Sequence, residues 1–156
     1  MTIDPSEQSL VQKNLAKARI IWFSNFIAAA ALYFIISTLS FTVVTDQPYV
    51  HYVLGGLAIS ELIVIVVMRR IRLKPSLIKS LSQSGQGEVA RNFFFIDVIS
   101  IFLSDSIMVY GVIGYVIIGD FQILKMFAAV TALALLYFFP RETVWTRQYE
   151  DSITSS

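Results

Sequence analysis

Three acidic residues, Glu61, Asp97 and Asp105, lie within long apolar stretches of the sequence. A carboxyl group in such surroundings can bind and release a proton or hold a cation. A charged side chain at the centre of a bilayer costs about 2.5–3.5 kcal/mol on insertion scales, so each acid needs a partner or a function. We therefore treat all three as candidate ion-binding residues.

The basic residues that border the apolar stretches set the depth of each acid. Asp105 lies 14 residues after Arg91, so a helix rising about 1.5 Å per residue brings it near the midplane of a bilayer. Glu61 lies 8 residues before Arg69, roughly 12 Å from the basic boundary. Asp97 is only 6 residues from Arg91, and we expect it to reach interfacial water or a basic residue.

Helical spacing distinguishes the acids further. Asp97, Ser100, Ser104 and Gly111 follow the 3–4–7 spacing that places residues on one helix face. This small and polar face is expected to point into a helix bundle, where the two serines would support the acid. Asp105 is displaced by about 100° from Ser104, so it is expected at the border of that face.

The apolar stretch that carries Glu61 offers small residues for close contact with the helix that carries Asp97 and Asp105. These small residues are Gly55, Gly56, Ala58 and Ser60. We expect the two stretches to pack through a small and polar seam that carries Glu61 and the other acids. An alternative stays open for each acid, namely a buried carboxyl group that only donates a hydrogen bond to a neighbouring helix.

The elements that must position these acids are four apolar stretches, each near the 20 residues that span a bilayer. They cover about residues 20–44, 49–68, 93–118 and 121–139. Hydrophobic residues make up 56% of the 156 residues and charged residues 15%, against about a quarter in soluble domains. Backbone polar groups in hydrocarbon must pair within their segment, which favours helices. The sequence predicts an all-α polytopic membrane protein, with four transmembrane helices in an antiparallel bundle and one membrane domain over residues 1–156.

The connections between the stretches differ in length. Residues 45–48 and 119–120 form tight links, so each joined pair is expected to be antiparallel and adjacent. The middle link, residues 69–92, is long and polar. Within it we expect a flexible segment at residues 82–87 and a short interfacial helix that carries Leu77, Ile78 and Leu81.

Basic residues predict the orientation. Eleven of the 12 Lys and Arg residues precede the first stretch, follow the last or lie in the middle link. Positive residues stay cytoplasmic, so the middle link and both termini are expected on the cytoplasmic side. The membrane is expected to be a plasma membrane, such as the bacterial inner membrane. The remaining residue, Lys125, is expected to extend its amine outward. Trp22 and Trp145 are expected at the inner membrane boundary.

Several function classes are disfavoured by composition. The chain has no cysteine and one histidine, His51, so we expect no disulfide, metal site or cofactor. Motifs of zinc proteases, serine hydrolases, P-loop enzymes and dinucleotide-binding proteins are absent from the sequence. A net charge of +1 and the lack of interleaved basic and aromatic residues argue against nucleic acid as a partner.

Residues 105–112, with the sequence DSIMVYGV, resemble the carboxylate-bearing helix of subunit c, the proteolipid of rotary ATP synthases. That family has an acid, a small residue, three mostly apolar residues, then Tyr-Gly and a branched apolar residue. The resemblance implies that Asp105 is the ion- or proton-binding carboxylate and that Tyr110 and Gly111 are its packing neighbours. It covers the third stretch and, loosely, the second. The first and fourth stretches have no counterpart in a two-helix proteolipid, so a working rotor subunit is not expected.

Three functions remain open from the sequence. The first is proton or cation handling through Asp105 together with Glu61. The second is a non-catalytic accessory subunit, assembly factor or scaffold, whose basic link at residues 69–91 binds a membrane protein partner or anionic lipid. A membrane enzyme is third, with no site to name. Association into a homo-oligomer is compatible with each.

Overall fold

The computed structural model describes residues 5–41, 49–84 and 87–147. Within these ranges the chain is helical and contains no strand, which confirms the predicted all-α class. Residues 142–147 form a short helical segment after the last long helix. The five main helices are α1 (Pro5–Ser37), α2 (Tyr49–Arg72), α3 (Pro75–Ser84), α4 (Glu88–Ile118) and α5 (Phe121–Tyr137).

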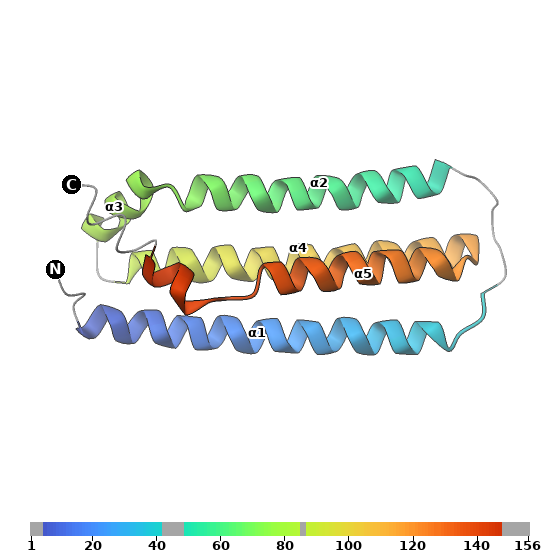
Figure 1. Cartoon of the computed structure of the whole chain (residues 1–156), viewed down its shortest axis with the longest axis horizontal. Helices are drawn as coiled ribbons and strands as arrows, with labels where there is room; N and C mark the ends of the chain where they lie inside the picture. The colour runs from blue at the N-terminus through green and yellow to red at the C-terminus, as the bar shows by residue number, and fades with distance from the viewer. Residues whose placement is uncertain (1–4, 42–48, 85–86, 148–156) are drawn as a thin grey trace.

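The four long helices lie side by side along the long axis of the molecule, and α3 lies at one end (Figure 1). We call this the α3 end. α4 is the central helix, because it packs against α1, α2, α3 and α5, whereas α2 packs chiefly on α4. Buried residues accordingly run along most of α4, and α2 buries only Leu54, Ala58 and Ile65.

Three helices are long and apolar enough to cross a membrane, namely α1 over Ser9–Ser37, α2 and α4. α5 is also apolar but has 17 residues. These lengths indicate a membrane protein, in which the apolar side chains exposed on the outside of the bundle face lipid.

α1 differs from the predicted stretch at both ends. It begins at Pro5, because proline suits a first helical turn and because Leu15 packs in a buried cluster at the α3 end. It ends at Ser37, where the hydroxyls of Ser37 and Thr38 donate to the carbonyls of Phe34 and Ile35. Such local bonds compete with helix continuation. Residues 42–44 and the predicted link at 45–48 lie outside the described residues.

The other long helices start or stop near the expected residues. α2 starts at Tyr49 and runs four residues beyond its predicted end, to Arg72. Its last turn is basic, which suits the negative end of a helix dipole, and Asn92 Nδ2 donates to the carbonyl of Arg72 at 3.1 Å. α4 starts five residues earlier than predicted, at Glu88. α5 ends two residues earlier than predicted, at Tyr137.

The link between α4 and α5 is as tight as its sequence indicates. Gly119 has a φ of 76°, a left-handed conformation that favours glycine, and its N–H donates to Tyr115 O at 2.8 Å. The side chain of Asp120 accepts a hydrogen bond from the Gln122 N–H at 2.9 Å and caps α5. The two helices therefore turn back on each other within two residues.

The middle link contains the expected short helix, α3, in which Ile78 is buried. Residues 82–84, which we expected to be flexible, belong to α3. Residues 85–86 lie outside the described residues. Helix formation here follows from packing, because Ile78 joins Leu15, Val89 and Trp145 in one buried cluster.

Close helix contact comes from the glycines of α4 and not from Gly55 and Gly56 of α2, where we expect it from the sequence. A Cβ atom on Gly55 or Gly56 would meet nothing within 4 Å, so these residues do not form a tight seam. On α4, a Cβ on Gly111 would lie 2.5 Å from Phe127 Cβ, and one on Gly114 would lie 2.8 Å from Ile123 Cγ2. The closest packing that needs glycine is therefore between α4 and α5.

Candidate functional site

The face of α4 defined by Asp97, Ser100, Ser104 and Gly111 is buried in the bundle. Ser100 Oγ donates to Ile96 O and Ser104 Oγ donates to Ser100 O, each at 2.7 Å. Both serine hydroxyls thus donate their hydrogen bonds to backbone carbonyls of their own helix. The two hydroxyls therefore donate no hydrogen bond to an acid.

Asp97 is 2% exposed, and both of its oxygens are paired. Arg69 Nη1 lies 2.9 Å from Oδ1 as an ion pair, and Trp145 Nε1 donates to Oδ2 at 2.9 Å. The guanidinium of Arg69 also lies 5.2 Å from the centre of the Phe138 ring. These contacts connect α2 and α4 with the C-terminal end of α5 and with residues 142–147, all at the α3 end. Asp97 therefore holds these four parts of the chain together.

Glu61 accepts a hydrogen bond at each carboxyl oxygen from two hydroxyls of α4. Ser106 Oγ lies 2.5 Å from Oε2, and Tyr110 OH donates to Oε1 at 2.6 Å. Ser106 and Tyr110 are four residues apart and therefore lie on the same face of α4. Glu61 is partly buried, and its two partners are neutral, in contrast to the partners of Asp97.

Ser106 has a choice of acceptor. Its Oγ lies 2.7 Å from Leu103 O as well as close to Glu61 Oε2, but a hydroxyl has one proton to donate. With Glu61 ionised, Ser106 donates to Oε2. With Glu61 protonated at Oε2, the acid donates to Ser106 Oγ, and Ser106 donates to Leu103 O. Tyr110 donates to Oε1 in both states, so the cluster satisfies either form of the acid.

Asp105 is not part of this cluster. It is partly buried, and within the described part of the chain it forms no hydrogen bond or ion pair. The residues that the subunit c resemblance assigns as its neighbours have other partners, since Tyr110 binds Glu61 and Gly111 faces Phe127. A role of Asp105 in ion binding stays a prediction.

Two site residues were missed at the level of sequence. The sequence indicates only a membrane-boundary position for Trp145 and not its contact with Asp97, to which its buried indole donates a hydrogen bond. Ser106 was only part of the subunit c pattern. Its spacing from Tyr110 was the available indication, because hydroxyls four residues apart can bracket an acid on a facing helix.

Among the described residues, no three His, Asp or Glu side chains gather into a group that could hold a metal ion. Comparison of the chain with protein-family models, curated proteins and solved structures finds no match. The fold and composition define an all-helical protein with three helices long and apolar enough to cross a membrane. Its functional assignment rests on the geometry of its own residues, foremost the Glu61 cluster.

Proposed function

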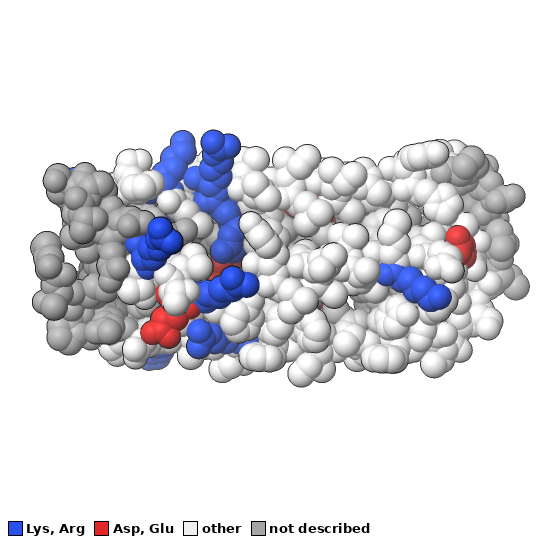
Figure 2. Space-filling view, in the orientation of Figure 1, with Lys and Arg blue, Asp and Glu red and all other residues white. Residues whose placement is uncertain are grey.

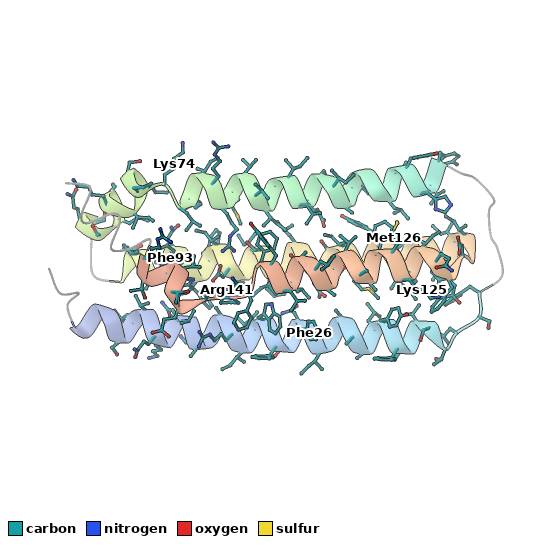
Figure 3. The ribbon with its side chains drawn as sticks, in the orientation of Figure 1. Phe26, Lys74, Phe93, Lys125, Met126 and Arg141 are labelled. Carbon is teal, nitrogen blue, oxygen red and sulfur yellow. The ribbon has the colours of Figure 1, made fainter. Side chains whose placement is uncertain are left out.

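We propose that this protein crosses a membrane four times, through α1, α2, α4 and α5, with both termini and α3 in the cytoplasm. The distribution of charge supports this. On the face shown in Figure 2 the Lys and Arg residues gather toward the α3 end, apart from one toward the other end, and the middle of this face carries none. Figure 3 labels Lys74 and Arg141 toward that end and Lys125 toward the other. Lys125 Nζ lies 4.8 Å from the centre of the Phe121 ring, which keeps the amine near the outer boundary.

We further propose that Glu61 binds and releases a proton within the membrane. The observation that carries this proposal is the Ser106 hydroxyl, which can donate either to Glu61 or to Leu103 O. Because Tyr110 holds the other oxygen in both states, gain or loss of the proton leaves no oxygen of the acid unpaired. Such an arrangement avoids the cost of an unpaired polar group in a low-dielectric site.

The surroundings of Glu61 favour coupling to a movement over free conduction. Ile65, one turn closer to the α3 end on α2, is completely buried between Glu61 and Arg69. On the other side, Leu54 and Ala58 are buried and apolar. The α2 residues next to Glu61 in this interface are therefore apolar, so we expect proton exchange at Glu61 to involve a change in how α2 packs on α4.

Distance measurement between α2 and α4 tests this function. The chain has no cysteine, so spin labels can be attached at Ile63→Cys and Val109→Cys, two exposed positions. In lipid nanodiscs we expect the distance distribution to differ between acidic and alkaline pH. Glu61→Gln should hold one distribution at every pH, whereas Asp105→Asn should respond as the unaltered chain does. An unchanged response in Glu61→Gln contradicts the proposal.

Cysteine labelling tests the orientation separately. Gln83 in α3 and Gln122 at the start of α5 are both exposed. In intact cells, a membrane-impermeant thiol reagent should label Gln122→Cys at once and Gln83→Cys only after the membrane is opened. The reverse pattern would invert the proposed topology, and labelling of both positions in intact cells would exclude it.

A second function, an accessory membrane subunit or scaffold, is favoured by the exposed basic residues at the α3 end. In the link at residues 69–91 the exposed basic residues are Arg70, Arg72, Lys74 and Arg91. Each such residue near an anionic membrane surface contributes about 1 kcal/mol of attraction. Native mass spectrometry should find anionic lipid retained by the unaltered chain and lost after Arg70→Gln and Arg72→Gln. Equal retention by both forms would argue against this function.

A further inference from the structure

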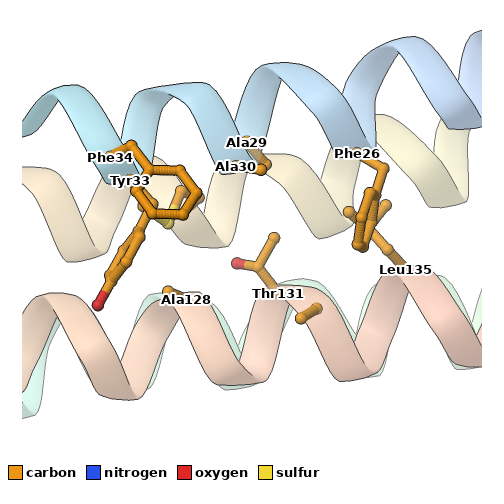
Figure 4. A pocket seen from close by; sticks show the side chains of 10 residues that line it. Phe26, Ala29, Ala30, Tyr33, Phe34, Ala128, Thr131 and Leu135 are labelled. Carbon is orange, nitrogen blue, oxygen red and sulfur yellow. The ribbon is translucent and has the colours of Figure 1, made fainter.

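A cavity of about 140 Å³ lies between α1 and α5, with α4 behind it. Figure 4 shows its lining: α1 carries Phe26, Ala29 and Ala30, and the side chain of Thr131 projects from α5 into the space between the two helices. Small side chains open the space, and aromatic rings bound its ends. Phe34, which is 67% exposed, lies at the rim, so the cavity is accessible from the lipid side.

Thr131 has a buried hydroxyl without a hydrogen-bond partner. Its side chain is 2% exposed, and among the described residues its Oγ1 is the one buried side-chain oxygen or nitrogen that forms no hydrogen bond. Threonine in a helix can donate to a carbonyl three or four residues before it. Ser100 and Ser104 do so on α4. An unpaired buried hydroxyl is uncommon in proteins and calls for an explanation.

We propose that this cavity binds a small aromatic ring that carries one hydroxyl, a phenol-like ligand taken up from the lipid phase. The size fits, because an apolar cavity of about 150 Å³ accommodates benzene. The aromatic side chains of Phe26 and Tyr33 at opposite ends offer edge and face contacts to a ring. A hydroxyl on that ring can donate to or accept from Thr131 Oγ1, whichever proton the threonine presents.

Other occupants fit the cavity less well. A buried water needs two to four polar partners, and the hydroxyl of Tyr33, the other polar group in the lining, lies well away from Thr131 (Figure 4). A lipid acyl chain has no polar atom and would leave Thr131 unpaired. The combination of a ring-sized apolar space with one unpaired hydroxyl therefore selects an aromatic alcohol.

The test compares two probes that differ by the hydroxyl, para-fluorophenol and fluorobenzene, by fluorine NMR titration of the purified chain in detergent micelles. Protein-free micelles correct for simple partitioning. We expect para-fluorophenol to bind about fivefold more tightly than fluorobenzene, because one additional hydrogen bond strengthens binding by about this factor. Thr131→Val keeps the side-chain shape and removes the hydroxyl, so it should abolish this preference and leave fluorobenzene binding unchanged.

A matched pair of alanine substitutions locates the binding site. Ala128→Leu fills the cavity and should abolish binding of both probes, whereas Ala129→Leu, at an exposed position on the adjacent face of α5, should change neither. If Ala128→Leu fails to fold, Ala30→Leu fills the cavity from α1. Binding no stronger than in protein-free micelles, a phenol preference that survives in Thr131→Val, or unchanged binding after either filling substitution would overturn the proposal.

Discussion

Asp97 and Glu61 stand in the same interface, between α2 and α4, but their surroundings differ in kind. Asp97 is buried and accepts hydrogen bonds from the guanidinium of Arg69 and the indole N–H of Trp145. Glu61 is partly buried and receives two neutral hydroxyls from Ser106 and Tyr110. One acid has a cation that balances its charge, whereas the other has only groups that tolerate either form of the acid.

This difference indicates that the two acids have different roles along α2 and α4, a fixed contact at Asp97 and an adaptable one at Glu61. Hydrogen bonds from a guanidinium and an indole fix the geometry of Asp97, so the Asp97 end holds α2, α4 and residues 142–147 together. The Ser106 hydroxyl can turn toward Glu61 or Leu103 O, so the Glu61 region can change state without losing hydrogen bonds. Substitutions should therefore be costly for stability at Asp97 and nearly neutral at Glu61.

The largest effect is expected for Asp97→Leu. Removal of this acid leaves the guanidinium of Arg69 without its ion partner in a site where its side chain is only 20% exposed. Breaking a buried ion pair in this way should lower the free energy of unfolding by about 3 kcal/mol. Unfolding in mixed detergent measures the loss. The double substitution with Arg69→Met should recover most of it, and a double variant as unstable as the single one would contradict the role of the pair.

A smaller effect is expected for Trp145→Phe. Phenylalanine keeps the ring contact with Phe93, whose centre lies 5.3 Å from that of Trp145, and removes the donor to Asp97. A hydrogen bond to a charged acceptor contributes about 1.5 kcal/mol or more. Trp22→Phe is the matched control, because the Trp22 indole donates to a neutral acceptor, Leu135 O, at 2.7 Å. It should cost about 1 kcal/mol, and a larger loss than at Trp145 would reverse the comparison.

Tyr110→Phe should destabilise the protein by about 0.6 kcal/mol, the average for a hydrogen bond between membrane helices. The ring remains in place, and the lost group is the hydroxyl that donates to Glu61 Oε1. The same unfolding measurement applies. Tyr137→Phe, at an exposed position outside the interface, should have no effect. A loss as large as that of Asp97→Leu would show that Glu61 is as rigidly tied as Asp97.

The smallest effect on stability is expected for Glu61→Gln. Glutamine keeps a carbonyl oxygen for Tyr110 and supplies an N–H₂ group that can donate to Ser106, so it reproduces the hydrogen bonds of the protonated acid. The free energy of unfolding should change by less than about 0.6 kcal/mol. A loss of several times this value would mean that the Glu61 carboxyl group holds the fold together as Asp97 does.

Much of the helical architecture could be predicted from the sequence. Apolar stretches of membrane-spanning length predict the long helices, and Gly119 with Asp120 predicts the tight turn between α4 and α5. The spacing of Asp97, Ser100 and Ser104 predicts which face of α4 is buried. These features are local, because each depends on residues within a few turns of one another.

The partners of the acids could not be predicted in the same way. α2 is apolar on nearly every side, so its pattern does not fix the rotation that turns Glu61 toward Ser106 and Tyr110. Trp145 reaches Asp97 because the chain folds back after α5, a tertiary event without a local pattern. The extension of α1 through Leu15 likewise depends on packing against α3 and α4.

The central claim is that Glu61, at the interface of α2 and α4, binds and releases a proton. Infrared difference spectroscopy of the carboxyl C=O stretch tests this claim most directly. Acidification of the unaltered chain in lipid should produce a protonated carboxyl band that disappears again at alkaline pH. The chain has 11 Asp and Glu residues, so we expect Glu61→Gln to remove one component of this band and Asp105→Asn to retain that component. A spectrum of Glu61→Gln identical to that of the unaltered chain would contradict the account.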